Sequence, residues 1–304
     1  MIPGLQIIER KIKENIENEL NNVGFLYRIF SRIKNIESIK EKKIRKEKEG
    51  NGYKIGDKLM QDVIGIRVVT YFQDDIDLII EILRTKLNYL SEEIDDHKLT
   101  VFKPKRTNII CEFSDEQKET FLSIQRTHQE FDIIDTTFEI QLRTILSEGW
   151  HEIDHTLRYK SKSDWSEHKE SERLLNGIYA SLEANDIALK NLFNELSYKH
   201  FKNHNWEGLL RTKFRLHFKI KPLNNKIIRI LNNNNGLAKE LMRLDRHDTL
   251  LTLYKANLSF PNTMDNLLYL INILILRDKN LFTITPDIII EAARNNVYKS
   301  LGEW

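Results

Sequence analysis

The segment from Phe138 to Arg143 places polar side chains on every second position of an expected β-strand. Successive side chains of a strand point to opposite faces, so Glu139, Gln141 and Arg143 share one face. A buried charge without a partner costs several kcal/mol, which makes a charged strand face rare unless it meets other groups. This strand therefore predicts both a sheet at the centre of the fold and a functional site on it.

The residues around this strand predict a mixed α/β domain. Apolar residues recur at helical spacing over residues 5–48, and a dense charge run and a glycine-containing turn follow. Residues 63–71 are rich in β-branched side chains and predict a strand, and residues 75–87 predict its crossover helix. Further elements are expected as strands at residues 99–102, 108–113 and 137–143, and as a helix from about residue 145.

The chain changes character after about residue 160. Residues 161–171 are polar, and the chain beyond them has amphipathic helical patterns with few strand signals. We place the domain boundary between residues 162 and 163, so that residues 1–162 form the α/β domain and residues 163–304 form a mainly helical extension. Within that extension, helices are expected at residues 237–244, 263–276 and 286–293.

Overall charge and cysteine content exclude several classes of protein. The 47 basic and 45 acidic residues leave a net charge of +2, which indicates no general affinity for nucleic acid or membrane. No segment approaches the roughly 20 apolar residues of a membrane span, and residues 1–10 lack the pattern of a secretory signal. The single Cys111 excludes an internal disulfide framework and fits a buried position in a cytoplasmic protein.

A second cluster, which consists mainly of cations, lies near the N-terminal side of the domain. Arg32, Lys34, Ser38 and Lys42 are spaced so that several of them meet near one end and side of an expected helix. Such a group can clamp a triphosphate, although a solvated charged helix face gives the same pattern.

Asp62 forms a third cluster with Arg67. Asp62 stands at the start of the strand at residues 63–71, where it can hold a metal ion or simply cap the strand. His151, Glu152 and His155 also follow the His-Glu-x-x-His order of zinc proteases. That motif is short, and the family described next explains the same helix better, so we expect no stoichiometric zinc.

The three clusters together resemble the RelA/SpoT alarmone synthetase family. Residues 32–42 resemble its ATP-binding segment, and the DVIGIR sequence at residues 62–67 resembles its aspartate strand. The strongest resemblance is FEIQLRTILSEGWHEIDHTLRYK at residues 138–160, which is similar to the glutamate strand and the helix after it. The resemblance covers roughly residues 20–162 and implies a nucleotidyltransferase-like mixed sheet flanked by helices.

The resemblance implies a role for each cluster. Asp62 and Glu139 would hold Mg²⁺, and Glu139 would also act as general base on the acceptor hydroxyl. The guanidinium planes of Arg32 and Arg67 would stack on adenine. The residues implied for ATP binding as a set are Arg32, Lys34, Ser38, Lys42 and Arg67.

The acceptor side departs from the family pattern. Family members usually carry a Gly-Tyr-x-Ser-x-His loop whose tyrosine stacks on guanine, and no such loop lies between Asp62 and Glu139. The corresponding region is residues 102–113, which offers cations but no aromatic residue after a glycine. The candidate acceptor-side residues are Lys103, Lys105, Arg106, Gln141, Arg143 and His155.

Three functions fit these residues. The first is Mg²⁺-dependent transfer of the β,γ-pyrophosphate of ATP to a guanosine nucleotide, as in (p)ppGpp synthesis. The second is a toxin that pyrophosphorylates the 3′ end of tRNA, with the cations of residues 103–106 or of the basic stretch 211–226 meeting RNA phosphates. The third is a non-catalytic nucleotide sensor, against which the presence of both Asp62 and Glu139 argues.

The helical extension suggests regulation rather than a second enzyme. It does not resemble the metal-dependent hydrolase half of long family members, so we expect no alarmone hydrolysis. We expect ATP and either a guanosine nucleotide or tRNA as partners, and residues 163–304 as a candidate region for homo-oligomerisation, for autoinhibition or for binding an antitoxin or another regulatory protein.

Overall fold

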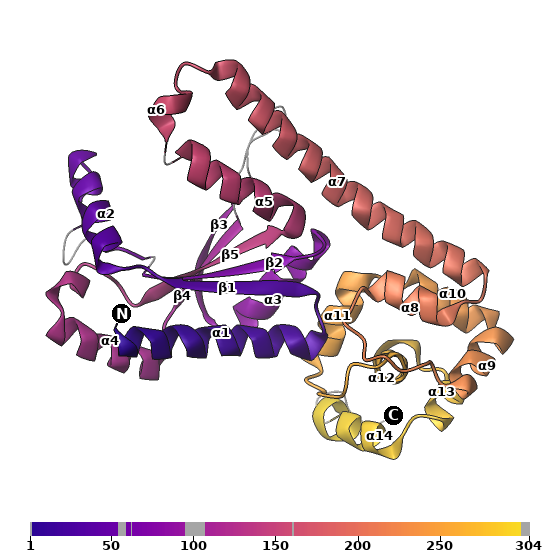
Figure 1. Ribbon diagram of the computed structural model, residues 1–304. Helices are drawn as coiled ribbons and strands as arrows, with labels where there is room; N and C mark the ends of the chain where they lie inside the picture. Colours follow the sequence, from indigo (N-terminus) through magenta and orange to yellow (C-terminus); the bar gives the residue numbers. More distant parts are fainter. Residues whose placement is uncertain (1, 54–58, 62, 95–106, 160, 299–304) are drawn as a thin grey trace. The chain divides into compact units, whose positions relative to one another are not determined.

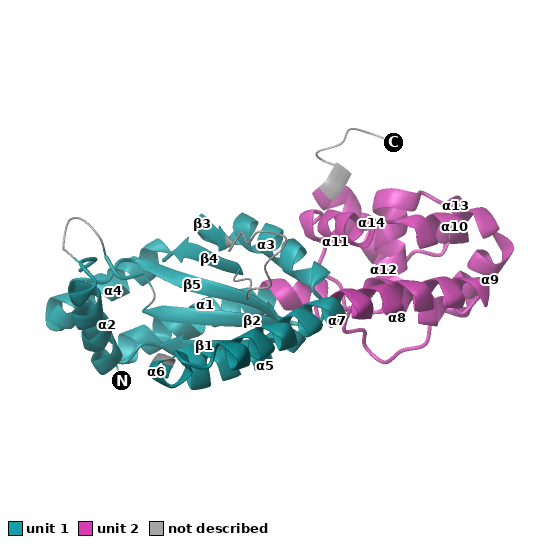
Figure 2. Ribbon diagram, turned by 90° about the horizontal axis from the view of Figure 1, so that it is seen from above, with its two compact units in different colours: residues 1–18, 27–186 teal, residues 19–26, 187–304 magenta. Residues whose placement is uncertain are grey.

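The computed structural model describes residues 2–53, 59–61, 63–94, 107–159 and 161–298. The chain divides into two compact units, with residues 1–18 and 27–186 in unit 1 and residues 19–26 and 187–304 in unit 2 (Figure 2). The domain boundary expected between residues 162 and 163 stays a prediction. The compact units divide later, inside one long helix, α7 (Lys169–Lys202).

Unit 1 is built on a five-stranded mixed sheet in the order β1-β2-β5-β4-β3. The central pair β2 and β5 is parallel, and every other neighbouring pair is antiparallel. This confirms the expected fold class, a mixed sheet flanked by helices with a helical C-terminal region. The strands are β1 (Tyr27–Ile33), β2 (Ile64–Thr70), β3 (Asn88–Ile94), β4 (Thr107–Glu112) and β5 (Thr137–Thr144).

Helices lie on both faces of the sheet. In Figure 1, α1 runs along one face and α5 lies over the other. The α1 face is apolar, since α1 buries Leu5, Ile8, Ile12 and Ile16 at 2% exposure or less. The other helical elements of unit 1 are α2 (Ile36–Lys48), α3 (Asp74–Lys86), α4 (Asp115–Thr127), η1 (Gln129–Phe131), α5 (Ile145–Ile153), the π-helix η2 (Asp154–Tyr159) and α6 (Lys162–Trp165), while α1 itself is Pro3–Val23.

The strands supply the same core from their own apolar side. Ile66 of β2, Ile140 of β5 and Ile109 of β4 are at most 1% exposed. Cys111 of β4 belongs to this core as expected: it is fully buried, and burial raises the pKa of its thiol to about 12. The apolar side of the central strands therefore belongs to the core.

The expectation of continuous helix over residues 5–48 was wrong in its middle. α1 ends at Val23, residues 27–33 form β1, and α2 begins only at Ile36. Gly24 takes a positive φ of 87°, and a Cβ there would stand 1.7 Å from the Asn262 amide nitrogen, so only glycine fits this chain reversal. β3 was also not expected, and the strand expected at residues 99–102 lies outside the described residues.

Every regular element described in unit 2 is a helix. The three helices expected there are confirmed as α10 (Asn235–Arg243), α12 (Met264–Ile271) continued by the π-helix η3 (Asn272–Leu276), and α14 (Asp287–Ala293). No described helix is both long enough and apolar enough to span a membrane. The remaining elements are α8 (Trp206–Phe214), α9 (Asn225–Asn233), α11 (Arg246–Lys255), α13 (Lys279–Thr283) and η4 (Arg294–Tyr298).

A buried carboxylate holds the start of α5. Thr144, the last residue of β5, caps α5 in a capping box with Ser147. The Thr144 hydroxyl also donates a 2.6 Å hydrogen bond to Asp186 of α7, a residue that is only 5% exposed. Burial raises the pKa of Asp186, because the charged form is poorly solvated there.

Asp186 should make the stability of the protein depend on pH. A carboxyl group with a raised pKa in the folded state stabilises most below its unfolded pKa of about 3.9, and this contribution is lost as pH rises through the folded pKa. Asp186→Asn has no such loss. We expect its free energy of unfolding to rise relative to that of the parent as pH increases from 4 to 8, measured by urea denaturation. A difference that stays constant with pH would contradict this account.

Candidate functional site

Three strands bring polar residues together on the α5 side of the sheet. The parallel register of β2 and β5 sets Gly65 beside Glu139 and Arg67 beside Gln141. The antiparallel register of β1 sets Arg32 beside Gly65. Because paired residues of neighbouring strands share a face, these side chains meet on one surface although they come from distant parts of the sequence.

A pocket of about 540 Å³ opens on this surface. Gly65 adds no side chain to it, and a Cβ at that position would touch the Arg32 side chain at 3.5 Å, so Arg32 lies directly over the glycine. Three residues expected at the site, Arg32, Arg67 and Gln141, line the pocket. The full lining is Phe30, Ser31, Arg32, Gly65, Ile66, Arg67, Gln141, Glu148 and Glu152.

Two carboxylates of α5 hold the Arg67 guanidinium. Its Nη1 donates to Glu148 Oε1 at 2.6 Å and also to Glu152, and its Nε donates to Gln141 Oε1 at 3.3 Å. Burial by itself lowers the pKa of Arg67, but the hydrogen bonds and charges of Glu148 and Glu152 outweigh it and the pKa is raised. Arg67 is therefore a fixed cation whose edges are occupied by protein groups.

Glu148 joins two arginines of the sheet. Its second oxygen, Oε2, accepts from Arg143 Nη1 at 3.0 Å, and its side chain is only 16% exposed. Burial is the main reason that the pKa of Arg143 is lowered, and the nearby positive charge of Arg67 lowers it further. Without Glu148 the two guanidinium groups would repel each other in a poorly solvated place.

Glu152 completes the lining one helical turn later. Its side chain is 53% exposed. Burial tends to raise its pKa, but the hydrogen bond and charge of Arg67 outweigh this and the pKa of Glu152 is lowered. The sequence contains the signal for both glutamates, since residues 148 and 152 have the i, i+4 spacing of one helix face, but their partners on the strands could not be read from it.

Lys34, Ser38 and Lys42 do not line this pocket. The expectation that they share a helix with Arg32 was wrong, because Arg32 belongs to β1 and Lys34 lies in the turn before α2. Ser38 lies in the first turn of α2, and its backbone N–H donates to the capping Asn35 at 2.7 Å. Lys42 lies one turn further along α2, with its Nζ 6.0 Å from the Tyr53 ring centroid. Lys34 thus stands between β1 and α2, and Ser38 and Lys42 stand on the first two turns of α2.

Glu139 is the described member of the expected metal pair. It is half-buried on the polar face beside Gly65, where an oxygen ligand suits a hard cation such as Mg²⁺. Its expected partner Asp62 lies outside the described residues, as do the candidate acceptor residues Lys103, Lys105 and Arg106. Among described residues, one cluster of potential ligands lies close enough for a metal, Asp245, His247 and Asp248 in unit 2, and none of these was expected at the site.

The two histidines of the His-Glu-x-x-His sequence have different surroundings. His151 is buried and packs against Trp150 and Tyr179. His155 is exposed and stacks on Tyr159 at 5.9 Å, in the π-helical segment η2. The change from α- to π-helix alters the spacing between the two histidines. His151 therefore has a packing role, and the acceptor-side role expected for His155 stays a prediction.

The basic stretch at residues 211–226 is not a uniform basic surface. Lys213 is turned inward, and its Nζ donates to the carbonyl oxygens of Met242 at 2.9 Å and Leu244 at 2.6 Å. Burial lowers the pKa of Lys213, and Arg215 is only 3% exposed. Lys213 and Arg215, two of the six cations at residues 211–226, therefore have structural roles. This weakens the expectation that the stretch binds RNA phosphates.

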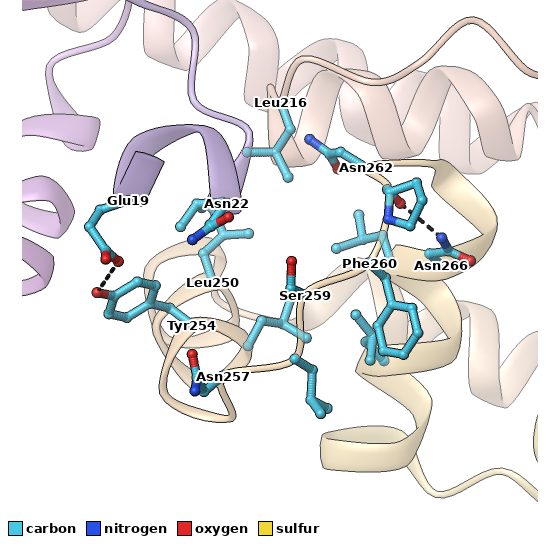
Figure 3. Close-up of a pocket in the computed structure, with 16 residues that line it drawn as sticks. Glu19, Asn22, Leu216, Leu250, Tyr254, Asn257, Ser259, Phe260, Asn262 and Asn266 are labelled. Carbon is cyan, nitrogen blue, oxygen red and sulfur yellow. Dashed lines mark hydrogen bonds between the residues drawn. The ribbon is translucent and has the colours of Figure 1, made fainter. Parts of the chain in front are cut away.

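Unit 2 has a smaller pocket of its own, of about 80 Å³ (Figure 3). Leucines such as Leu216 and Leu250 form part of its lining, and Tyr254 donates a 2.7 Å hydrogen bond to Glu19 beside it. None of the residues expected at the functional site lies in this pocket.

Comparison with protein-family models gives one description for a region that contains most of the residues lining the larger pocket. The model described as "Region found in RelA / SpoT proteins" matches residues 31–164. Comparison with curated protein sequences gives no match.

The solved structures that are similar to this chain include proteins from Bacillus subtilis and Streptococcus pneumoniae. Small alarmone synthetase 1 from Bacillus subtilis, bound to its product pppGpp, is 20% identical, with 64% of this chain and 95% of that chain covered and a TM-score of 0.46. Small alarmone synthetase 2 from Bacillus subtilis is 22% identical, with 63% and 92% covered and a TM-score of 0.45. A GTP pyrophosphokinase family protein from Streptococcus pneumoniae is 21% identical, with 62% and 89% covered and a TM-score of 0.44.

Glu148 should contribute much more to stability than Glu152. Glu148→Gln removes the charge shared by two partly buried arginines, and we expect it to lower the free energy of unfolding by about 1–3 kcal/mol. Glu152→Gln, at a half-exposed position, should lower it by less than about 1 kcal/mol. Urea denaturation of both variants measures this difference, and equal losses would show that the bridge to Arg143 adds nothing.

Proposed function

We propose, from the premise that residues 31–164 form a RelA/SpoT region, that this protein is a Mg²⁺-dependent enzyme that transfers the β,γ-pyrophosphate of ATP to a ribose hydroxyl of a guanosine nucleotide. The main support is one coincidence. The matched residues contain eight of the nine residues that line the 540 Å³ pocket on the polar face of the sheet, all except Phe30. The region that resembles the family is thus also the region with a built, charged cavity.

The donor half of the reaction has suitable groups in the described residues. Arg32 and Arg67 present guanidinium groups to the pocket, and such planar cations stack well on a purine ring. Lys34 and Lys42, with the N-terminal end of α2, would neutralise the phosphates beyond the pocket, because a helix N-terminus and nearby cations both favour anions.

Glu139 would have two roles at the acceptor end of the same face. With Asp62 it would hold Mg²⁺, which when bound neutralises phosphate charge during transfer. Its carboxylate would also take the proton of the attacking hydroxyl. AMP would be released from ATP as the pyrophosphate is transferred. Gln141 and Arg143 continue the face beside it.

Two acceptors fit the proposed transfer. A guanosine nucleotide is the usual acceptor implied by the resemblance, and the tRNA 3′ end is the alternative because the guanine-stacking loop is missing from the sequence. The deciding experiment offers GDP, GTP and tRNA in parallel to the full chain with Mg²⁺ and γ-labelled ATP. Label on a guanosine nucleotide supports the proposal, label on tRNA alone favours the toxin, and no label on any acceptor favours a non-catalytic sensor.

Arg32 should be needed for ATP binding. It is exposed, so Arg32→Ala should fold normally, and loss of one charged, stacking contact should weaken ATP binding by about 10- to 100-fold. Arg28→Ala is the matched control, because Arg28 is exposed on the same strand and face but lies outside the pocket lining. Calorimetric titration with ATP measures both variants, and equal affinities would remove Arg32 from the site.

Glu139 should be needed for turnover rather than for folding. Glu139→Gln keeps the shape of the side chain but cannot take a proton, so we expect pyrophosphate transfer to fall about 100-fold or more. Glu112→Gln, on the neighbouring strand β4 and paired with Lys118 at 3.0 Å, is the control and should retain parental activity. Parental turnover in Glu139→Gln, with unchanged thermal stability, would exclude Glu139 as the base.

A further inference from the structure

The charges of the pocket balance. Its lining contains two cations, Arg32 and Arg67, and two carboxylates, Glu148 and Glu152. Arg67 is already engaged by both glutamates, and Glu152 is held in its charged form by the lowered pKa. A triphosphate placed here would face both carboxylates at close range, so the pocket suits an uncharged part of a ligand.

The surfaces of the pocket suit a flat ring. Phe30 of β1 is 50% exposed and lies in the lining, next to Arg67 across the β1–β2 pair. Hydrogen bonds to Gln141 and the glutamates occupy edges of the Arg67 guanidinium, which leaves a planar face for stacking. An exposed aromatic ring beside guanidinium groups is a surface on which a nucleobase stacks well.

Gln141 offers a donor to such a base. Its Oε1 accepts from Arg67 Nε at 3.3 Å and from Arg143 Nη2 at 3.5 Å. Both arginines can only donate, so the oxygen of the amide must face them. The NH₂ group of Gln141 is then the part that remains for a ligand in the pocket.

Glu152 offers an acceptor in the same lining. One of its oxygens, Oε1, takes the hydrogen bond from Arg67, and a carboxylate has further lone pairs that can accept from a ligand. With its side chain 53% exposed, this carboxylate is accessible from the pocket. Glu152 and Gln141 therefore form an acceptor and donor pair beside a stacking surface.

We propose that Glu152, with Gln141, recognises the amino edge of adenine and so makes this pocket selective for ATP over 6-oxopurine triphosphates as pyrophosphate donor. This inference rests on the proposed function. Adenine presents a 6-amino donor next to a ring-nitrogen acceptor, which complements the pair. A 6-oxopurine reverses both groups, so its O6 meets a carboxylate and its N1–H meets an NH₂ donor, and both contacts repel.

The test compares the binding of ATP, ITP and purine riboside triphosphate to the full chain with Mg²⁺ by calorimetric titration. ITP has the 6-oxo group, and purine riboside triphosphate has no group at that position. We expect the parent to bind ATP at least about tenfold more tightly than ITP, with purine riboside triphosphate between them. Equal affinity for ATP and ITP, or for ITP and purine riboside triphosphate, would overturn the proposal, and neither result depends on a variant.

Glu152→Gln should relax this selectivity, because an amide can turn its NH₂ toward O6. We expect the ATP to ITP ratio to fall to within about threefold, while Glu170→Gln, an exposed glutamate of α7 outside the pocket, should keep the parental ratio. Equal weakening of ATP and ITP binding in Glu152→Gln would mean that Glu152 only supports Arg67, and would overturn the proposal.

Binding and transfer separate this inference from the proposed function. A parent protein that prefers ATP in binding and loses that preference in Glu152→Gln, but transfers no pyrophosphate to any acceptor, would reject the function and keep the inference. A parent protein that transfers pyrophosphate equally well from ATP and ITP would keep the function and reject the inference.

Discussion

The bridge from Glu148 to Arg67 and Arg143 is the interaction on which the rest of the site depends. The two arginines stand on neighbouring parallel strands, and the pKa of Arg143 is lowered first by burial and then by repulsion from Arg67. A single carboxylate on α5 engages both, with one oxygen for each. It thereby stabilises a cationic sheet face and ties α5 to that face, and a pocket remains between them.

This bridge requires that α5 begin directly after Thr144, the last residue of β5. Thr144 ends β5 and caps α5, so Glu148 lies four residues after the cap and Glu152 one turn later, both on the side that faces the strands. Asp186 of α7 accepts a hydrogen bond from the same threonine. The position of the glutamates is therefore determined by a short strand-to-helix junction and by one buried carboxylate, and not by α5 alone.

Local patterns predicted much of the fold and singled out three of the residues that line the pocket, Arg32, Arg67 and Gln141. The alternation in β5 placed Glu139, Gln141 and Arg143 on one face, and the structure has them there. β1 was missed because its apolar residues continue the spacing of α1, while the break depends on the positive φ of Gly24, which a periodicity does not register. The pairing of Glu148 with Arg67 could not be predicted either, since it depends on the register of β2 against β5, a contact between residues 81 positions apart.

The polar face has a region of balanced charge and a region of positive charge. Arg32 and Arg67 alone would make the pocket attractive to phosphate, yet Glu148 and Glu152 neutralise that attraction at short range. Lys34 and Lys42 have no place in the pocket lining, since Lys34 stands just before α2 and Lys42 on its second turn. A nucleotide that follows these charges would turn its base toward α5 and its phosphates toward α2. Under the proposed function, residues of the pocket would govern which donor binds, and Glu139 would govern how fast the transfer occurs.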